Sequence, residues 1–211
     1  MKDGWTMLDS SNELSPIQMD ILKEIGNIGA GNAASALAQM VNTKIDMKVP
    51  QVRLLSFNEV VETLGGADKL VAGIYLSISG SATCSLLFVL PIQSARTLAA
   101  MLIGMPPQGE SVSEMEASAL MEVGNIMCAT YMNVIAQMTN MVLSPSVPAL
   151  GIDMAGSVLD AILASYGEID DHVLLMENEF VKDEQGVMGN FFLLPEPGSL
   201  EKIFSALGVS L

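Results

Sequence analysis

The sequence predicts a single mixed α/β domain with internal pseudo-two-fold symmetry. Three observations support this fold class: half of the 211 residues are hydrophobic, helical and strand-like segments alternate, and their order repeats after a shift of 98 residues. A chain of this length and hydrophobicity can bury a sizeable core. We therefore assign residues 1–211 to one domain with internal repeats at about 13–110 and 111–211.

The first repeat is expected to open with a long helix that runs to about Val41. Ser15 can cap this helix, and Pro16 suits its first position. Isoleucines at helical spacing predict its buried face: Ile17, Ile21, Ile25 and Ile28. The elements expected next are a strand at 49–57, a hairpin of strands at 71–79 and 82–90, and a short helix at 91–103.

The second repeat begins with the same signals. Ser113 and Glu116 have the spacing of a capping box at the start of a second long helix. The predicted apolar stripe there comprises Met115, Ala119, Val123 and Ile126. The elements expected after it are a strand at 146–154, a helix at 157–166, strands at 172–181 and 187–194, and a last helix between 195 and 208.

The composition excludes several classes of function. A formal net charge of −15 argues against binding to nucleic acid or to an anionic membrane surface. The charge serves either solubility or the attraction of a basic partner. Polar residues interrupt the two long uncharged stretches, 70–95 and 123–152, so we interpret both as core segments and expect no membrane insertion.

Cysteine and histidine are too few for the common metal and nucleophile chemistries. Cys84 and Cys128 each lie in an apolar run, which is typical of small buried residues. His172 is the single histidine and is surrounded by acidic residues. A zinc site therefore lacks ligands, and we expect no protein-bound metal and no catalytic histidine.

One polar constellation occurs twice, at the same place in each long helix. In each copy a short polar residue is followed by Glu at i+4 and Asn at i+7, positions that lie on one helical face. The copies comprise Asp20, Glu24 and Asn27, and Ser118, Glu122 and Asn125. The next positions on these faces, Gly31 and Ala129, are small and leave the backbone open to close approach.

This constellation suits the positioning of a water molecule for attack on phosphorus. A carboxamide can donate and accept hydrogen bonds at once, and a carboxylate can pair with a cation of a bound protein. Phosphoryl transfer depends mainly on such positioning. The alternative is a solvated helix face without chemistry, but glycine and asparagine are poor helix formers, and their repetition beside each Glu argues against it.

The doubled pattern (Asp/Ser)-x3-Glu-x2-Asn-x22-Pro resembles that of the CheC, CheX and FliY group of bacterial chemotaxis phosphatases, and the CheC-type members fit it best. Pro50 and Pro148 complete the two copies. The resemblance extends to segments such as Lys44–Met47 and Leu54–Phe57, and it covers about residues 14–211. It implies a mainly antiparallel sheet of about six strands, with the two long helices packed antiparallel on it.

The resemblance also implies an activity: hydrolysis of the aspartyl phosphate of the response regulator CheY. Asn27 and Asn125 would orient the attacking water, and Glu24 and Glu122 would pair with a lysine of the regulator. Asp20, Ser118, Pro50 and Pro148 would be supporting residues. This chain would bind no cofactor, since Mg²⁺ would belong to the regulator. The location implied is the cytoplasm.

A second partner implied by the resemblance is the receptor deamidase CheD. Asp153 in the second repeat has Leu55 as its counterpart in the first repeat, so an exposed acid there could mark a docking surface. A solvated acid at a strand end is the alternative. The runner-up function is a non-catalytic module that sequesters CheD or docks at receptor or flagellar switch complexes. The sixteen methionines suit either an adaptable partner surface or core filling.

Overall fold

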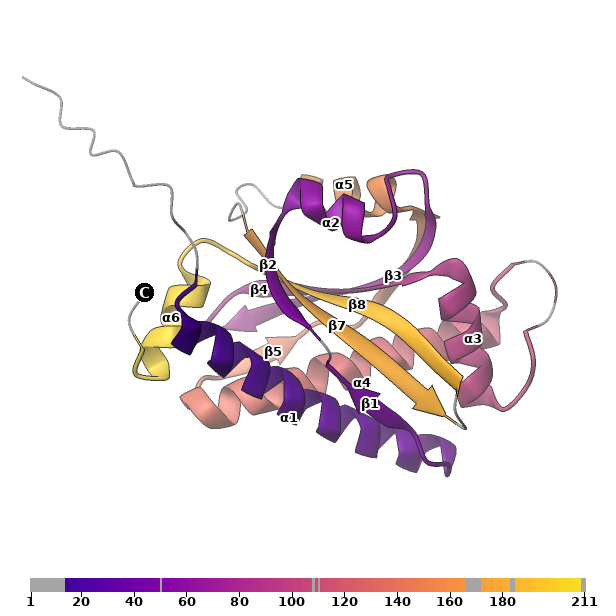
Figure 1. Cartoon of the computed structure of the whole chain (residues 1–211), viewed down its shortest axis with the longest axis horizontal. Coiled ribbons are helices and arrows are strands. Elements are labelled where there is room, and N and C mark those ends of the chain that lie inside the picture. Colours follow the sequence, from indigo (N-terminus) through magenta and orange to yellow (C-terminus); the bar gives the residue numbers. More distant parts are fainter. Residues whose placement is uncertain are drawn as a thin grey trace, which may run out of the picture.

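Figure 1 shows the computed structural model of the chain, which describes residues 14–49, 51–107, 109, 111–165, 172–182 and 185–209. The elements in chain order are α1 (Pro16–Val41), β1 (Asp46–Lys48), β2 (Val52–Ser56), α2 (Phe57–Thr63), β3 (Leu70–Gly80), β4 (Cys84–Pro91), α3 (Ile92–Ile103), α4 (Glu114–Thr139), β5 (Leu143–Pro145), β6 (Ala149–Met154), α5 (Ala155–Ser165), β7 (His172–Lys182), β8 (Gln185–Pro195) and α6 (Ser199–Ala206). Helices cover both faces of one sheet, so the expected mixed α/β class is confirmed.

The described strands form a single antiparallel sheet with the order β1-β7-β8-β4-β3-β5. Both edges are divided into two short strands: β1 and β2 pair with β7, and β5 and β6 pair with β3. The eight strands therefore occupy six positions, which agrees with the expected sheet of about six strands.

The two halves of the chain exchange their edge strands. β1 and β2 from the first half lie on β7 of the second half, while β5 and β6 from the second half lie on β3 of the first. The elements follow a pseudo-two-fold axis between β4 and β8, which pair at the centre. The long helices α1 and α4 have 26 residues each and begin 98 positions apart.

The core has two layers because side chains alternate across the sheet. On β4, Leu86 and Phe88 face the larger layer under α1, α3, α4 and α6, while Leu87 and Val89 face the smaller layer under α2 and α5. The central strand β4 is apolar except for Ser85, because both of its faces are buried.

The helices α1 and α4 lie side by side and run in opposite directions, as expected (Figure 1). They are in close contact at Gly29, where an added Cβ would lie 2.7 Å from Cδ1 of Tyr131. The Tyr131 ring stacks on Phe191 with centroids 4.8 Å apart. Its hydroxyl donates a 2.9 Å hydrogen bond to Oδ1 of the buried Asn178. This cluster joins both helices to β7 and β8.

The predicted apolar stripes are only partly correct. Ile25 and Val123 are buried as expected, but Ile17 and Met115 are 64% and 57% exposed, and Ile28 is also exposed. The buried face of α1 is rotated toward smaller residues. In α1 the buried residues are Gln18, Leu22, Ile25, Gly26, Gly29, Ala30, Ala33 and Leu37. Small side chains on this face let the helix approach the sheet and its neighbour closely.

Two predicted strands are shorter than expected, two short strands precede them, and one helix was not expected. The range predicted at 49–57 contains β2 and that at 146–154 contains β6, while β1 and β5 lie before these ranges. Helix α2 begins directly after Ser56, whose backbone N–H donates to Oε2 of Glu59 at 2.8 Å. This Ser-x-x-Glu capping pattern is a signal in the sequence that predicts a helix start. The last helix is shorter than expected.

Among the described helices, α4 alone is long and apolar enough to cross a membrane, judged by length and composition. Half of its most apolar window is buried inside the fold. The buried face packs on the sheet and on α1, so the apolar character of α4 has an explanation within the core.

The N-terminal caps of the two long helices differ in charge. Gln18 completes the capping box of α1, whereas Glu116 completes that of α4, accepting from the Ser113 N–H at 2.7 Å. Glu116 is buried, and its Oε1 lies 3.8 Å from Nε of Arg96 on α3. The hydrogen bonds from Ser113, with the positive charge of Arg96, lower the pKa of Glu116 below its usual value.

We expect the substitution Glu116→Gln to make the domain less stable at neutral pH. A carboxyl group with a lowered folded-state pKa stabilises the fold above its unfolded pKa of about 4.3 and loses this effect as the pH falls through the folded value. The deficit of the variant in the free energy of unfolding should therefore shrink between pH 7 and pH 3. Urea titrations at several pH values measure it, with exposed Glu114→Gln as the matched control. An equal deficit at all pH values would contradict this account.

The substitution Tyr131→Phe should lower the free energy of unfolding by about 1 to 3 kcal/mol, because Oδ1 of buried Asn178 loses its hydrogen bond. The ring contacts with Gly29 and Phe191 would remain. Urea denaturation measures the loss. A double-mutant cycle with Asn178→Ala should give a coupling energy clearly different from zero. A loss below about 0.5 kcal/mol would show that the hydrogen bond contributes little.

Candidate functional site

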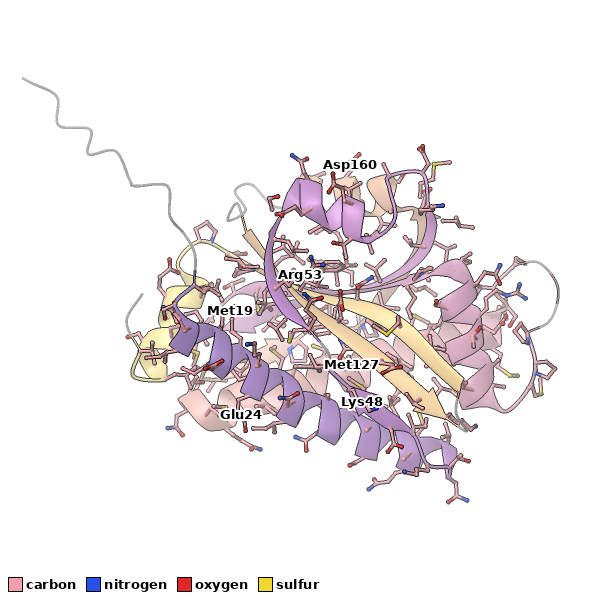
Figure 2. All side chains as sticks on the ribbon, in the orientation of Figure 1. Met19, Glu24, Lys48, Arg53, Met127 and Asp160 are labelled. Carbon is pink, nitrogen blue, oxygen red and sulfur yellow. The ribbon has the colours of Figure 1, made fainter. Side chains whose placement is uncertain are left out.

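The two polar constellations lie on outward faces of the paired helices. Glu24 and Asn27 are exposed on α1, and Figure 2 shows Glu24 on the side of α1 away from the sheet. Glu122 and Asn125 are likewise exposed on α4. The two members of each pair are one helical turn apart, so each pair can contact one bound molecule.

The side chains of these pairs have no partners within the described part of the chain. Glu24 and Glu122 form no ion pair there, and no hydrogen bond engages the amide groups of Asn27 and Asn125. Asp20 differs, because its carboxylate lies 3.6 Å from Nζ of Lys23 in an exposed ion pair. Such surface pairs contribute little stability. The Glu and Asn side chains are thus available to a binding partner.

A glycine precedes each asparagine and faces the sheet. A Cβ at Gly26 would make ordinary contacts, 3.5 Å to Cγ1 of Val49 and 3.7 Å to Sδ of Met176. A Cβ at Gly124 would overlap Cγ2 of Ile74 and lie 3.2 Å from its Cβ. The Glu and Asn faces therefore belong to helix segments that lie directly on the sheet.

The small positions beyond each asparagine differ in exposure. Gly31 is exposed, and a Cβ added there would meet no atom within 4 Å, as expected for an open backbone. Ala129 is half-buried. Ser118, the counterpart of Asp20, is exposed on the face of Glu122.

Of the two prolines of the pattern, only Pro148 lies within the described residues. Pro50 lies outside the described residues, between Val49 and β2. Pro148 is half-buried directly before β6. Its segment is held to β3 by two hydrogen bonds, from the Ser146 N–H to the Ser77 carbonyl at 2.8 Å and from the Ser77 N–H to Oγ of Ser146 at 3.1 Å. This arrangement fits a structural role for Pro148.

Other nucleophile and metal chemistry finds little support in the described residues. Cys84 and Cys128 are buried free thiols, as predicted, and burial raises the pKa of each to about 12. A thiol with such a pKa is a poor nucleophile at neutral pH. Within the described ranges, no three His, Cys, Asp or Glu side chains are grouped to hold a metal ion. His172 begins β7.

Asp153 lies apart from the two constellations, on the other face of the sheet. It is exposed on the edge strand β6, opposite Val71 of β3. A cavity of about 420 Å³ between β6 and α5 is lined by Asp153 and, among others, Gly73, Gly151 and Ile162. Apolar side chains supply much of its wall.

The residues that line this cavity differ from those at the positions related by pseudo-symmetry. Gly73 and Gly151, which pair between β3 and β6, correspond to Leu175 and Arg53, which pair between β7 and β2. The Arg53 guanidinium lies 3.7 Å from a carboxylate oxygen of Glu177 and also donates to Oγ1 of Thr63 at 3.4 Å. The glycines that line the cavity beside Asp153 are thus not repeated at the equivalent positions.

Ile74 and Met176, which lie on the sheet beneath α4 and α1, were not predicted from the sequence as supports of these helices. The repeated glycine before each asparagine was a signal for them, because a glycine in mid-helix often marks a close approach. The partner on the sheet could not be inferred, since it comes from the strand exchange between the halves.

Comparisons with known proteins agree with this geometry. The model of the family described as CheC-like matches residues 17–53 and 115–152, the two segments that carry the repeated pattern. The chain is 42% identical to the CheY-P phosphatase CheC of Bacillus subtilis over 205 residues, which cover 95% of this chain and 98% of that protein.

Solved structures share the fold at low sequence identity. FliY of Thermotoga maritima superposes with a TM-score of 0.71 at 20% identity, covering 92% of this chain and 98% of that one. A chain of the CheX-CheY-BeF3-Mg+2 complex from Borrelia burgdorferi gives 0.50 at 19% identity, covering 80% and 96%. With a relative 42% identical over nearly its full length, this chain belongs to the CheC-like family.

Proposed function

We propose that this protein hydrolyses the aspartyl phosphate of a CheY-type response regulator. The observation that carries the proposal is the pair of exposed Glu–Asn faces, one on each of two helices, whose side chains have no partner in the described chain. The activity named for the Bacillus subtilis relative is the same. The complex of a CheX with CheY shows that a protein of this fold binds such a regulator.

The reaction needs few groups from this chain. Asn27 or Asn125 orients a water molecule in line with the phosphorus, and Glu24 or Glu122 pairs with a lysine of the regulator. Water adds to phosphorus, the bond from phosphorus to the aspartyl oxygen breaks, and the products are a free carboxylate and inorganic phosphate. Mg²⁺, as part of the substrate, neutralises charge on the phosphoryl oxygens. The cytoplasm, where response regulators act, is the proposed location.

The double substitution Asn27→Ala/Asn125→Ala should abolish phosphate release from the phosphorylated regulator with Mg²⁺. Loss of a water-orienting group commonly lowers a rate by 10²-fold or more. Each single variant should keep part of the activity, since the other site remains. Stopped-flow or phosphate-release assays measure the rates.

The matched control is Asn133→Ala, an exposed asparagine about two turns beyond Asn125 on α4. It should keep the wild-type rate. Full activity in the Asn27→Ala/Asn125→Ala protein would contradict the proposed mechanism. Activity near zero in all proteins, together with regulator binding that survives both changes, would favour the alternative of a non-catalytic binding module.

A second proposed role is binding of the deamidase CheD through the surface around Asp153. The cavity of about 420 Å³ and the exposed Asp153 carboxylate lie on the sheet face opposite the two Glu–Asn faces, and the counterpart of Asp153 in the first repeat is Leu55. A partner could therefore bind there without covering either face. The net charge of −15 would attract a basic partner surface.

Reversing the charge at this surface tests the second role. Asp153→Lys should weaken CheD binding at least tenfold and leave basal phosphate release unchanged. Asp160→Lys is the matched control, because Asp160 is an exposed acid of α5, on the same side of the sheet but not in the cavity lining (Figure 2). Isothermal titration calorimetry measures the CheD affinity of both variants. Equal affinity for the wild type and Asp153→Lys would exclude Asp153 from the interface.

A further inference from the structure

Different residues of the sheet lie beneath α1 and α4, the two helices that carry the Glu–Asn pairs. Ile74 of β3 lies under Gly124, and Met176 of β7 lies near Gly26. Their positions are equivalent: each is on the outer strand of its own hairpin, and each pairs with an edge strand from the other half, at Leu150 and Val52 respectively. The two helices therefore rest on chemically distinct supports at the same point.

The support under α4 is tight. The three atoms nearest to a Cβ at Gly124 all belong to Ile74, and the nearest, Cγ2, would overlap it. Ile74 is fully buried, pairs with Phe88 and Leu150 on its two sides, and is branched at Cβ, so it has little freedom to move.

The support under α1 is looser. A Cβ at Gly26 would find its three nearest atoms at 3.5 to 3.9 Å, on the side chains of Val49, Met176 and Val52. These are ordinary contact distances, and methionine adapts its shape more readily than isoleucine. The segment of α1 before Asn27 can therefore shift toward or away from the sheet at low cost.

These contacts lie one residue from each water-orienting asparagine, and a helix transmits a displacement of its backbone to the next residue. We propose that Ile74 is a positioning residue for the second site: through Gly124 it fixes the height of Asn125 above the sheet, while the first site rests on an adaptable support. The inference depends on the proposed phosphatase function. Misplacement of a catalytic group by about 1 Å can cost up to 10²-fold in rate.

The experiment isolates each site before perturbing its support. Asn27→Ala leaves only the second site, and Asn125→Ala leaves only the first. In the Asn27→Ala protein, Gly124→Ala should lower kcat for phosphate release by about tenfold or more. KM for the phosphorylated regulator should change by less than about threefold, because Glu122 and the outer face remain. In the Asn125→Ala protein, the matched change Gly26→Ala should lower kcat by no more than about twofold.

Compensating changes at Ile74 give the most specific readout. Ile74→Leu keeps the side-chain volume but removes the Cγ2 methyl group that meets Gly124, so it should restore most of the kcat lost through Gly124→Ala. Ile74→Val keeps a branched Cβ with both methyl positions and should not restore it. On its own, with Gly124 intact, Ile74→Leu should lower kcat of the second site at least threefold and leave the first site unchanged.

The possible outcomes separate the two proposals. Without activity in either single-site protein, the phosphatase proposal itself fails. With both active, an unchanged kcat for Gly124→Ala overturns the positioning role, as does equal rescue by Leu and Val. Thermal unfolding and near-UV circular dichroism show whether each variant is folded. If Gly124→Ala does not fold, Ile74→Leu alone decides: a lowered kcat at the second site only supports the role, and any other result overturns it.

Discussion

The arrangement of the domain depends on how closely α1 and α4 approach each other, and the contact of Tyr131 with Gly29 sets that approach. No side chain larger than hydrogen fits at Gly29, since a Cβ would lie 2.7 Å from the ring. The ring in turn is held by Phe191 and by the hydrogen bond to Asn178. The Glu–Asn faces of both helices remain exposed, where a large partner can reach them.

On each helix, the asparagine proposed for catalysis and the glycine that contacts the sheet are consecutive residues, about 100° apart around the helix axis. Gly26 and Gly124 face the sheet, and the residues directly after them, Asn27 and Asn125, face solvent. A catalyst that only orients water and pairs with a cation needs no buried or strongly perturbed acid, because the phosphorylated partner supplies the reactive group and completes the site. An exposed site of this kind is compatible with a core that is closely packed immediately beneath it.

Much of the fold was predictable from local signals. Ser15, Pro16, Ser113 and Glu116 located the starts of both long helices, and the 98-residue shift predicted their equivalence. The buried faces were only partly predictable from hydrophobicity: Ile25 and Val123 are buried as predicted, but Ile17 and Met115 are exposed. The exchange of edge strands, and with it the supports Ile74 and Met176, depends on pairing between distant segments that no local pattern encodes. The outward position of the Glu–Asn faces followed from helical periodicity.

The exchange of edge strands between the two halves suggests how such a protein could arise by duplication. A single repeat with this connectivity would leave its hairpin without an edge strand, and its own two short strands without a partner. It could complete the sheet only against a second, identical copy, as a symmetric dimer. In a dimer of identical chains any substitution appears at both positions. Joining the copies in one chain removes that restriction, so equivalent positions can differ, as Ile74 differs from Met176 and Arg53 from Gly151, and evolution can specialise each half separately.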